Sequence, residues 1–348
     1  MAHSIYRIPD RQILIDGEPH LYFGGTAYLG LQAYFPFQDL YLKNVLKYGM
    51  HYGASRKSNV SLEIYGKAEN YLAEWVGSED CLTMSSGYLA AQLVVQTLLE
   101  KGHTILAAPN AHKALCSNGV IVTSCFEELE KLVSKELTQN NPMPVVLFDT
   151  IDFSGQQYPD FKSLTKLPLD KVILIGDDSH GMGIVGENGS GCYRMLKSLK
   201  PAKLMVCCSL GKALAIQAGA IFGDKDAIQK LESTAFYGGA SPASPSFMGT
   251  LLDAKALFSE RLQTLKTNYR YFKSQLKNPS FFNHMEGHPS FEFQNIRIAA
   301  SLKNDGFIFT NFNYPDDNGP IVSRIVLSAY HEKDDIRRLA NSLNSHLK

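Results

Sequence analysis

The feature that most constrains the fold is a regular alternation of short, β-branched runs with longer segments of helical periodicity. The runs lie at 104–108, 145–148, 172–175, 204–208 and 220–222. Between them, segments such as 125–137 place apolar residues three and four positions apart. This alternation predicts an α/β domain with a mainly parallel sheet that helices cover on both faces. The ligands of such a sheet bind beyond the carboxyl ends of its strands.

The local composition changes around 236–245, where glycine, serine and proline are frequent. A long helical segment at 246–276 follows. Short strands at 307–312 and 323–327 and a helix at 334–347 indicate a small α+β domain at the C-terminus. We therefore predict an N-terminal arm packed on the small domain, a large domain and the small domain, with bounds at 1–45, 46–240 and 241–348.

The composition excludes several classes of protein. The 34 Lys and Arg residues balance the 34 Asp and Glu residues, so neither a nucleic acid nor a membrane surface is the expected partner. Neither a signal-length apolar run in 1–10 nor a run of about 18 apolar residues elsewhere is present, which predicts a cytoplasmic protein. Its six cysteines have no C-x-x-C spacing, so we expect reduced thiols and no metal site.

Polar side chains follow the run at 172–175, where the sequence reads Gly-Asp-Asp-Ser-His-Gly. Asp177, Asp178 and His180 thus stand where a parallel sheet presents groups to a ligand. An ordinary turn also tolerates aspartate and glycine, so a purely structural role is the alternative.

A lysine follows the next apolar run, in Cys-Cys-Ser-Leu-Gly-Lys-Ala. Ser209 and Lys212 stand three residues apart, and Lys212 is the only charged residue in 204–220. Its apolar neighbours predict burial, which lowers the pKa of an amine and makes it a nucleophile toward carbonyl groups. The alternative is a solvated lysine beyond the end of a strand.

Upstream, Ser-Ser-Gly-Tyr-Leu-Ala-Ala opens a predicted helix. Ser86 and Gly87 place a hydroxyl and an unhindered backbone at its N-terminus, which suits an anion, although a serine cap alone explains the same pattern. An anion cradle, an acid that can pair with a pyridine nitrogen, and a buried lysine are together what pyridoxal 5′-phosphate (PLP) requires of a protein.

The order of these motifs resembles the fold-type I PLP-dependent enzymes, and within them the α-oxoamine synthases, the group of 8-amino-7-oxononanoate synthase and 2-amino-3-ketobutyrate CoA ligase. Asp-x-x-His-Gly, followed about thirty residues later by Ser-x-x-Lys, is the specific part of the likeness. The matching stretches span nearly the whole chain and begin at residues 28, 52, 85, 177, 209 and 324. The resemblance implies a homodimer with PLP as cofactor, and an amino acid and an acyl-CoA as substrates.

Residue by residue, the resemblance implies that Lys212 forms the imine with PLP, Asp177 pairs with the pyridine nitrogen and His180 contacts the phenolic oxygen. It assigns the phosphate to Ser209 and to the turn Ser86, Gly87 and Tyr88, and it stacks His112 on the ring. Arg324 would take the carboxylate of the amino acid, for which a guanidinium is suited, whereas a surface arginine before a strand is the alternative.

The chain departs from the family pattern at several positions near the substrate. Thr26 and Ala27 replace the family's Asn-Asp, and Val60 and Tyr65 replace a glycine and a histidine. Gly238 and Gly239 stand where a Ser-Thr pair would reach the partner's phosphate, with Ser241 or Ser244 as substitutes. Asp152 replaces a serine. These departures weaken the prediction of an acyl-CoA substrate and leave the prediction of PLP as cofactor unchanged.

Three other functions compete with a synthase. Gly181-Met-Gly-Ile-Val-Gly matches the dinucleotide fingerprint G-x-G-x-x-G, but Glu187-Asn-Gly-Ser-Gly follows where an apolar helix should begin. A scaffold of this fold without catalysis conflicts with the presence of Lys212, Asp177 and His180. A PLP-dependent aminotransferase would share the early steps of the synthase reaction, and the departures at 26, 60 and 65 keep it open.

Overall fold

In a computed structural model of the chain, the described residues are 3–109, 111–112, 115–139, 141–314 and 317–347. They divide into two compact units. Unit 1 comprises 1–38, 153–155 and 256–348, and unit 2 comprises 39–152 and 156–255. The helices α1 (Phe35–Tyr48) and α9 (Lys255–Gln275) each cross a boundary between the units.

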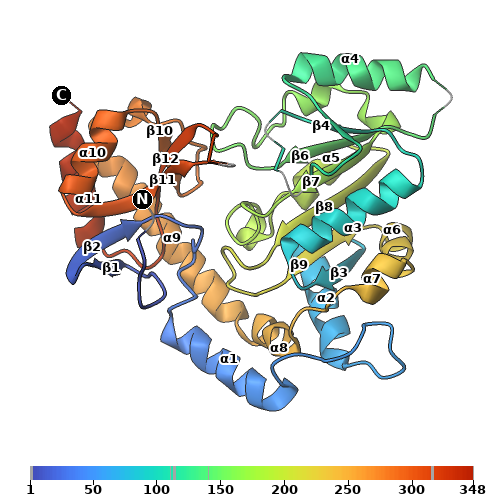
Figure 1. Cartoon of the computed structure of the whole chain (residues 1–348), viewed down its shortest axis with the longest axis horizontal. Coiled ribbons are helices and arrows are strands. Elements are labelled where there is room, and N and C mark those ends of the chain that lie inside the picture. The colour runs from blue at the N-terminus through green and yellow to red at the C-terminus, as the bar shows by residue number, and fades with distance from the viewer. Residues whose placement is uncertain (1–2, 110, 113–114, 140, 315–316, 348) are drawn as a thin grey trace. The chain divides into compact units, whose positions relative to one another are not determined.

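Unit 2 is built on a seven-stranded sheet (Figure 1). Its order is β3 (Asp80–Met84), β9 (Gly219–Gly223), β8 (Lys203–Ser209), β7 (Ile173–Asp177), β6 (Val145–Asp149), β4 (Ile105–Ala107) and β5 (Val120–Val122). The pairs from β8 through β5 are parallel, whereas β9 is antiparallel to both of its neighbours. The predicted, mainly parallel sheet is confirmed, with all five predicted strands in it.

Helices cover both faces of this sheet. On one face, Leu147, Ile175 and Cys207 share a core with α3 (Gly87–Glu100), and the alternate residues Val146 and Leu174 are also fully buried. The other helices are α2 (Glu63–Val76), α4 (Phe126–Leu137), α5 (Tyr193–Ser198), α6 (Lys225–Glu232), α7 (Ala235–Gly239) and α8 (Pro245–Asp253), with 3-10 turns at Leu164–Lys166, Leu169–Lys171 and Glu187–Gly189. Strand residues that are apolar at every position are what two covered faces require.

Unit 1 contains a five-stranded sheet. Its order is β1 (Gln12–Ile15), β2 (Glu18–Phe23), β11 (Phe307–Asn313), β12 (Ile321–Val326) and β10 (Ser290–Phe293). Only β2 and β11 pair in parallel. The helices α9, α10 (Ile296–Asn304) and α11 (Lys333–His346) and a 3-10 turn at Pro279–Phe281 belong to the same part of the chain. The N-terminal segment is thus an integral part of the sheet of the small α+β unit.

A buried histidine joins the two ends of the chain in unit 1. The His331 Nδ1 accepts a hydrogen bond from the Ser328 backbone N–H at 2.9 Å, and its Nε2 lies 2.9 Å from the Tyr22 carbonyl oxygen. The ring stacks on Phe23 with 4.0 Å between ring centroids. Burial lowers the pKa of His331 to about 4. A neutral imidazole therefore ties the turn after β12 to β2.

The helical segment predicted at 246–276 is confirmed, and it consists of two consecutive helices, α8 and α9, with a break at Ala254. No glycine or proline marks the break, so the apolar pattern runs through it. The two compact units meet at 38/39 and 255/256, and the domain bounds of 45/46 and 240/241 stay a prediction. Among the described residues, no helix combines the length and the hydropathy needed to cross a membrane.

Candidate active site

The carboxyl ends of three parallel strands bring the acidic site residues together. Asp149 at the end of β6 is in register with Asp177 at the end of β7, and Asp177 is in register with Cys207 on β8. Since β8 ends two residues later at Ser209, the predicted residues Asp177 and Ser209 share one edge of the sheet. This is the edge at which parallel sheets bind their ligands.

Lys212 and His180 meet at this edge. The Lys212 Nζ lies 2.8 Å from the His180 Nε2. Lys212 stands in a loop that starts after β8 and is closed by a hydrogen bond of 2.9 Å from the Leu210 N–H to the Ala218 carbonyl oxygen. The lysine is half-buried rather than fully buried. The amine is thus held against an imidazole while part of it stays accessible.

Asp177 and Ser209 are linked through Ser179, which the sequence interpretation did not single out. The Ser179 N–H donates to the Asp177 Oδ1 at 2.9 Å, and the Ser209 N–H donates to the Ser179 Oγ at 2.9 Å. The carboxylate therefore has a fixed orientation at the end of β7.

His112 also lies at this edge, and Asp149 holds it there. The backbone N–H of His112 donates to the Asp149 Oδ1 at 2.9 Å. Burial lowers the pKa of His112, Lys212 adds to this effect, and Asp177 opposes it, so the imidazole lies within electrostatic reach of both groups. The neighbouring residues 110, 113 and 114 lie outside the described part of the chain.

Asp149 is a site residue that the sequence interpretation missed. Burial raises its pKa well above the usual range, and the neighbouring Asp177 carboxylate raises it further. A carboxylate directly after an apolar strand, in Val-Val-Leu-Phe-Asp, was the available signal. Only strand pairing shows that this strand end adjoins that of β7.

The start of α3, where the sequence predicts an anion cradle, packs against the end of β8. The Ser86 Oγ caps the helix by accepting from the Leu89 N–H at 3.2 Å, and Tyr88 is exposed. A Cβ on Gly87 would lie only 2.8 Å from the backbone N of Ser209, so the turn packs directly on the strand end. The first N–H groups of a helix have no partner within the helix and favour an anion.

These residues fit PLP. The cofactor carries a phosphate, a pyridine nitrogen, a phenolic oxygen and an aldehyde, and the cradle, Asp177, His180 and Lys212 offer a partner of matching chemistry for each. The close approach of Gly87 to Ser209 leaves room for backbone donors but not for another side chain. All of these residues belong to unit 2.

Arg324 belongs to unit 1, where β12 pairs it with Glu292 of β10 and Thr310 of β11. Its guanidinium carbon lies 3.9 Å from the centroid of the Phe153 ring, and its Nη2 lies 3.6 Å from the Glu292 Oε2. The Arg324 Nε is buried and has no hydrogen-bond partner among the described residues. Its role as the carboxylate anchor stays a prediction.

In the comparison with known proteins, no family model matches the chain. The 8-amino-7-oxononanoate synthase of Aliivibrio fischeri strain MJ11 is 28% identical over an alignment of 357 positions. The alignment covers 95% of this chain and 90% of that protein. A structure of Sphingomonas wittichii serine palmitoyltransferase covers 99% of this chain and 91% of its own, with a TM-score of 0.81 and 16% identity. That of 8-amino-7-oxononanoate synthase from Francisella tularensis has a TM-score of 0.72 and 18% identity, and covers 94% and 98%.

The chain is similar in sequence to 8-amino-7-oxononanoate synthases and has the type I fold of PLP-dependent enzymes. The sequence-based resemblance and the fold class are therefore confirmed. The dinucleotide alternative is wrong in structural terms, because the glycines of 181–186 form turns that lead into a 3-10 turn, and no α-helix begins there.

Several positions that depart from the α-oxoamine synthase pattern have structural partners. Tyr65, which replaces a histidine, is buried, and its hydroxyl donates to the Ala243 carbonyl oxygen at 2.8 Å. The Asp152 Oδ2 accepts from the N–H groups of 156 and 157. The Ser244 Oγ donates to the Met50 carbonyl oxygen, and Ser241 is exposed. Val60 is exposed as well.

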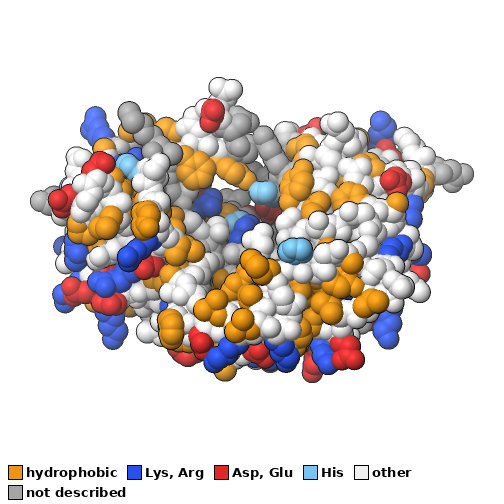
Figure 2. All heavy atoms as spheres, turned by 60° about the horizontal axis from the view of Figure 1, so that its bottom comes forward, with side chains coloured by type: hydrophobic (Ala, Val, Ile, Leu, Met, Phe, Trp, Pro, Cys, Tyr) orange, Lys and Arg blue, Asp and Glu red, His pale blue; other side chains and the backbone are white. Residues whose placement is uncertain are grey.

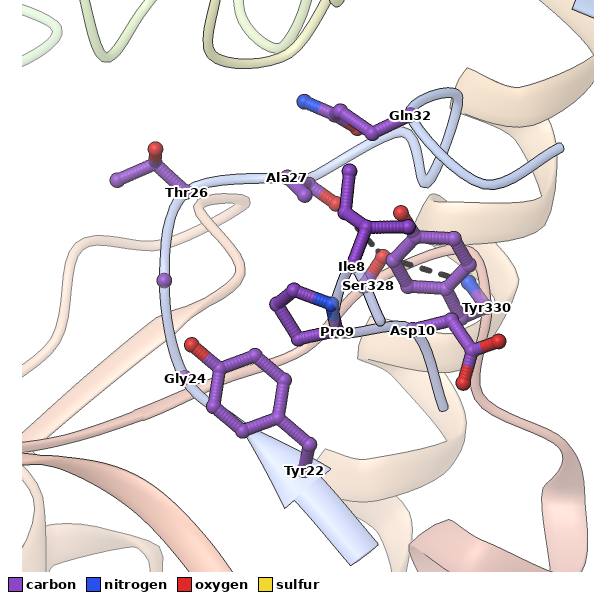
Figure 3. Close-up of a pocket in the computed structure, with 11 residues that line it drawn as sticks. Ile8, Pro9, Asp10, Tyr22, Gly24, Thr26, Ala27, Gln32, Ser328 and Tyr330 are labelled. Atoms are coloured by element: carbon purple, nitrogen blue, oxygen red, sulfur yellow. Dashed lines mark hydrogen bonds between the residues drawn. The ribbon is translucent and has the colours of Figure 1, made fainter. Parts of the chain in front are cut away.

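Thr26 lines a hollow of about 190 Å³ in unit 1 (Figure 3). Its other lining residues are Ile8, Pro9, Asp10, Tyr22, Gly24, Gly25, Ala27, Gln32, Ser328 and Tyr330. In the figure the Tyr22 and Tyr330 rings flank Pro9 and Asp10. None of the predicted catalytic or cofactor residues lines this hollow.

Proposed function

We propose that the chain is a PLP-dependent acyltransferase that condenses an amino acid with an acyl-CoA and releases CO₂. The observation that carries the proposal is the meeting of Lys212, His180 and Asp177 at the strand ends of the sheet in unit 2. The likeness to 8-amino-7-oxononanoate synthase over 95% of the chain supports the acyl-transfer part. The proposed location is the cytoplasm, where both kinds of substrate are available.

Each side chain at this edge has a distinct task in the proposal. Ser86, Gly87, Tyr88 and Ser209 would hold the phosphate through N–H and O–H donors. The Asp177 carboxylate would keep a proton on the ring nitrogen, and His180 would orient the phenolic oxygen. His112 would cover the face of the ring and exclude water. When bound, PLP serves as a sink for the electrons left on the substrate α-carbon.

Lys212 both attaches the cofactor and moves a proton. Its Nζ would take the proton from the α-carbon of the amino acid, and the nearby His180 Nε2 keeps the amine in place. In the overall reaction a carbon–carbon bond forms between the α-carbon and the acyl carbonyl carbon. The carbon–sulfur bond of the thioester and the bond to the α-carboxylate break, so that free CoA thiol and CO₂ leave with uptake of one proton.

Free thiol and CO₂ distinguish this reaction from its alternatives. The purified protein with PLP should be incubated with a panel of amino acids and acyl-CoA thioesters, and both products measured. Equal amounts of thiol and CO₂, dependent on both substrates, are the expected result. Formation of an oxo acid without thiol release would instead identify an aminotransferase, and no product from any pair would contradict the proposed enzyme.

Replacement of Arg324 by alanine should weaken amino-acid binding and leave PLP bound. Loss of a charge-assisted bidentate pair costs on the order of 2–4 kcal/mol, which corresponds to roughly 30- to 1,000-fold in apparent affinity. The measurement is a titration of amino acid against the visible spectrum of the cofactor. Arg297→Ala, at an exposed arginine of the same unit, is the matched control. If Arg324→Ala loses the cofactor, or binds amino acids as tightly as the parent, the assignment is wrong.

We also propose a homodimer, as the resemblance to α-oxoamine synthases implies. The support in this chain is an apolar surface on unit 2. Leu42 and Leu46 of α1 and Met50 just beyond it are 60%, 89% and 72% exposed. Hydrophobic side chains are grouped on the side of the molecule turned forward in Figure 2, on which α1 lies. Leu42 and Leu46 are one helical turn apart and thus share a face, which a second copy would remove from water.

Leu42→Glu combined with Leu46→Glu should dissociate the dimer. Burying a leucine stabilises by about 1.5–3 kcal/mol, and two copies contribute four leucines, so the dissociation constant should rise by at least ~100-fold. Sedimentation velocity over a concentration series measures this change. Lys43→Glu, on the same helix between the two leucines, is the control. A parent protein that sediments as a monomer with PLP bound would exclude the proposed dimer.

A further inference from the structure

Asp178, the residue directly after β7, is buried, and both of its carboxylate oxygens accept hydrogen bonds. Its Oδ1 accepts from the Thr150 Oγ1 at 2.5 Å, and its Oδ2 accepts from the Cys192 N–H at 2.8 Å. Only 3% of the residue is exposed. Thr150 lies just beyond β6 and Cys192 lies at the end of the 179–191 loop, so one carboxylate joins both ends of this loop to the neighbouring strand end.

The loop is folded closely around this carboxylate. A Cβ on Gly181 would lie 2.1 Å from the Asp178 Oδ1, and a Cβ on Gly191 would lie 2.0 Å from the Oδ2. Distances this short exclude any side chain at either position. Of the glycines that resemble a dinucleotide fingerprint, Gly181 is therefore explained by contact with Asp178, whereas a Cβ on Gly183 would meet Ala213 and Leu214.

The Asp178 carboxylate is held by neutral donors. Burial raises its pKa to about 6, and the hydrogen bonds from Thr150 and Cys192 counteract part of this rise. Burying a charge without a cation is costly, and the two hydrogen bonds offset part of that cost. The carboxylate therefore holds the loop through these two directed hydrogen bonds and not through an ion pair.

We propose that Asp178 is the positioning residue that sets His180 against Lys212. The inference rests on the proposed function of that pair. Asp178 stands between Asp177 and Ser179, and the Ser179 Oγ accepts from the Ser209 N–H at 2.9 Å. His180 comes next and reaches the Lys212 Nζ at 2.8 Å. Loss of the Asp178 carboxylate would remove the side-chain bonds from the loop to Thr150 and Cys192, and the backbone bonds that remain would hold His180 less firmly.

The fluorescence of Trp75 can be used to monitor the same loop. Trp75 is the only tryptophan of the chain, and its Nε1 donates to the carbonyl oxygen of Asn188 at 3.3 Å. Asn188 lies between Gly181 and Gly191, on the part of the loop that surrounds Asp178. The emission of Trp75 in protein without cofactor therefore reports the loop independently of catalysis.

Asp178→Ala tests the positioning role directly. In cofactor-free protein, its Trp75 emission should move to longer wavelength as the loop opens to water. The dissociation constant for PLP should rise at least ~10-fold, because His180 no longer faces the cofactor. Asp178→Asn can keep both hydrogen bonds, since the Thr150 hydroxyl can also accept, and it should stay within about 3-fold of the parent. Asp224→Ala, which removes the cap of α6, is the control for a general loss of stability.

The outcomes separate this proposal from the assigned function. If the parent binds no PLP, the proposed function fails whatever Asp178 does. If the parent binds PLP and Asp178→Ala matches it in emission and affinity, the positioning role is overturned. It is overturned as well if Asp178→Asn loses affinity as strongly as Asp178→Ala, because the charge would then be required. Should Asp178→Ala not fold, Thr150→Val removes one of the two bonds, and parent-like emission and affinity would reject the proposal.

Discussion

Replacement of Lys212 by alanine should abolish both the covalent attachment of PLP and turnover. In the parent, borohydride should link the cofactor irreversibly to this lysine, and in the variant no linkage should form. In the proposed function Lys212 is the nucleophile and also the proton carrier, and general acid–base catalysis alone contributes ~10²–10⁴-fold to a rate. We therefore expect turnover to fall at least ~1,000-fold.

Mass spectrometry of the reduced and digested protein locates the adduct. Lys203 offers the matched control, because it is exposed at the opposite end of the same strand, β8. Lys203→Ala should keep both the adduct and the activity. An adduct on any lysine other than Lys212, or its absence from the parent, would show that the strand-end lysine has a different role. The 2.8 Å contact between Lys212 and His180 would then have to be explained as a structural one.

Asp177→Asn should retain the cofactor and lose most of the turnover. The amide can still accept from the Ser179 N–H, so the loop should keep its structure. A neutral amide cannot hold a proton on the ring nitrogen, and the electron sink is weakened accordingly. Loss of about 4 kcal/mol of transition-state stabilisation corresponds to roughly 1,000-fold in rate.

Two measurements on this variant are needed together. PLP affinity should change little, whereas the turnover number should fall, and the thermal midpoint should stay near that of the parent. Asp224→Asn, at a helix cap of the same unit, controls for the exchange of aspartate by asparagine. Turnover close to that of the parent would show that Asp177 serves only the turn after β7.

Much of the site could be predicted from local sequence alone. An apolar, β-branched run that ends in polar residues predicts both a strand and the end that faces a ligand, and β7 and β8 end at Asp177 and Ser209 as this rule requires. Lys212 and Ser86 stood out for similar reasons, because charge within an apolar segment and a hydroxyl before a helix are visible without any tertiary contact.

The sequence by itself therefore determined the class of fold and the strand ends, because helix and strand periodicity act over a few residues. Its local motifs and the resemblance to a known family indicated the cofactor. The tertiary structure alone decided that Asp149 adjoins Asp177, since register between strands depends on pairing across distant segments. It also decided that Asp178 is bonded to Thr150 and Cys192, whereas Asp177, its neighbour, accepts from the Ser179 N–H. Adjacent aspartates look alike in a sequence, and only burial and hydrogen-bond partners assign them different tasks.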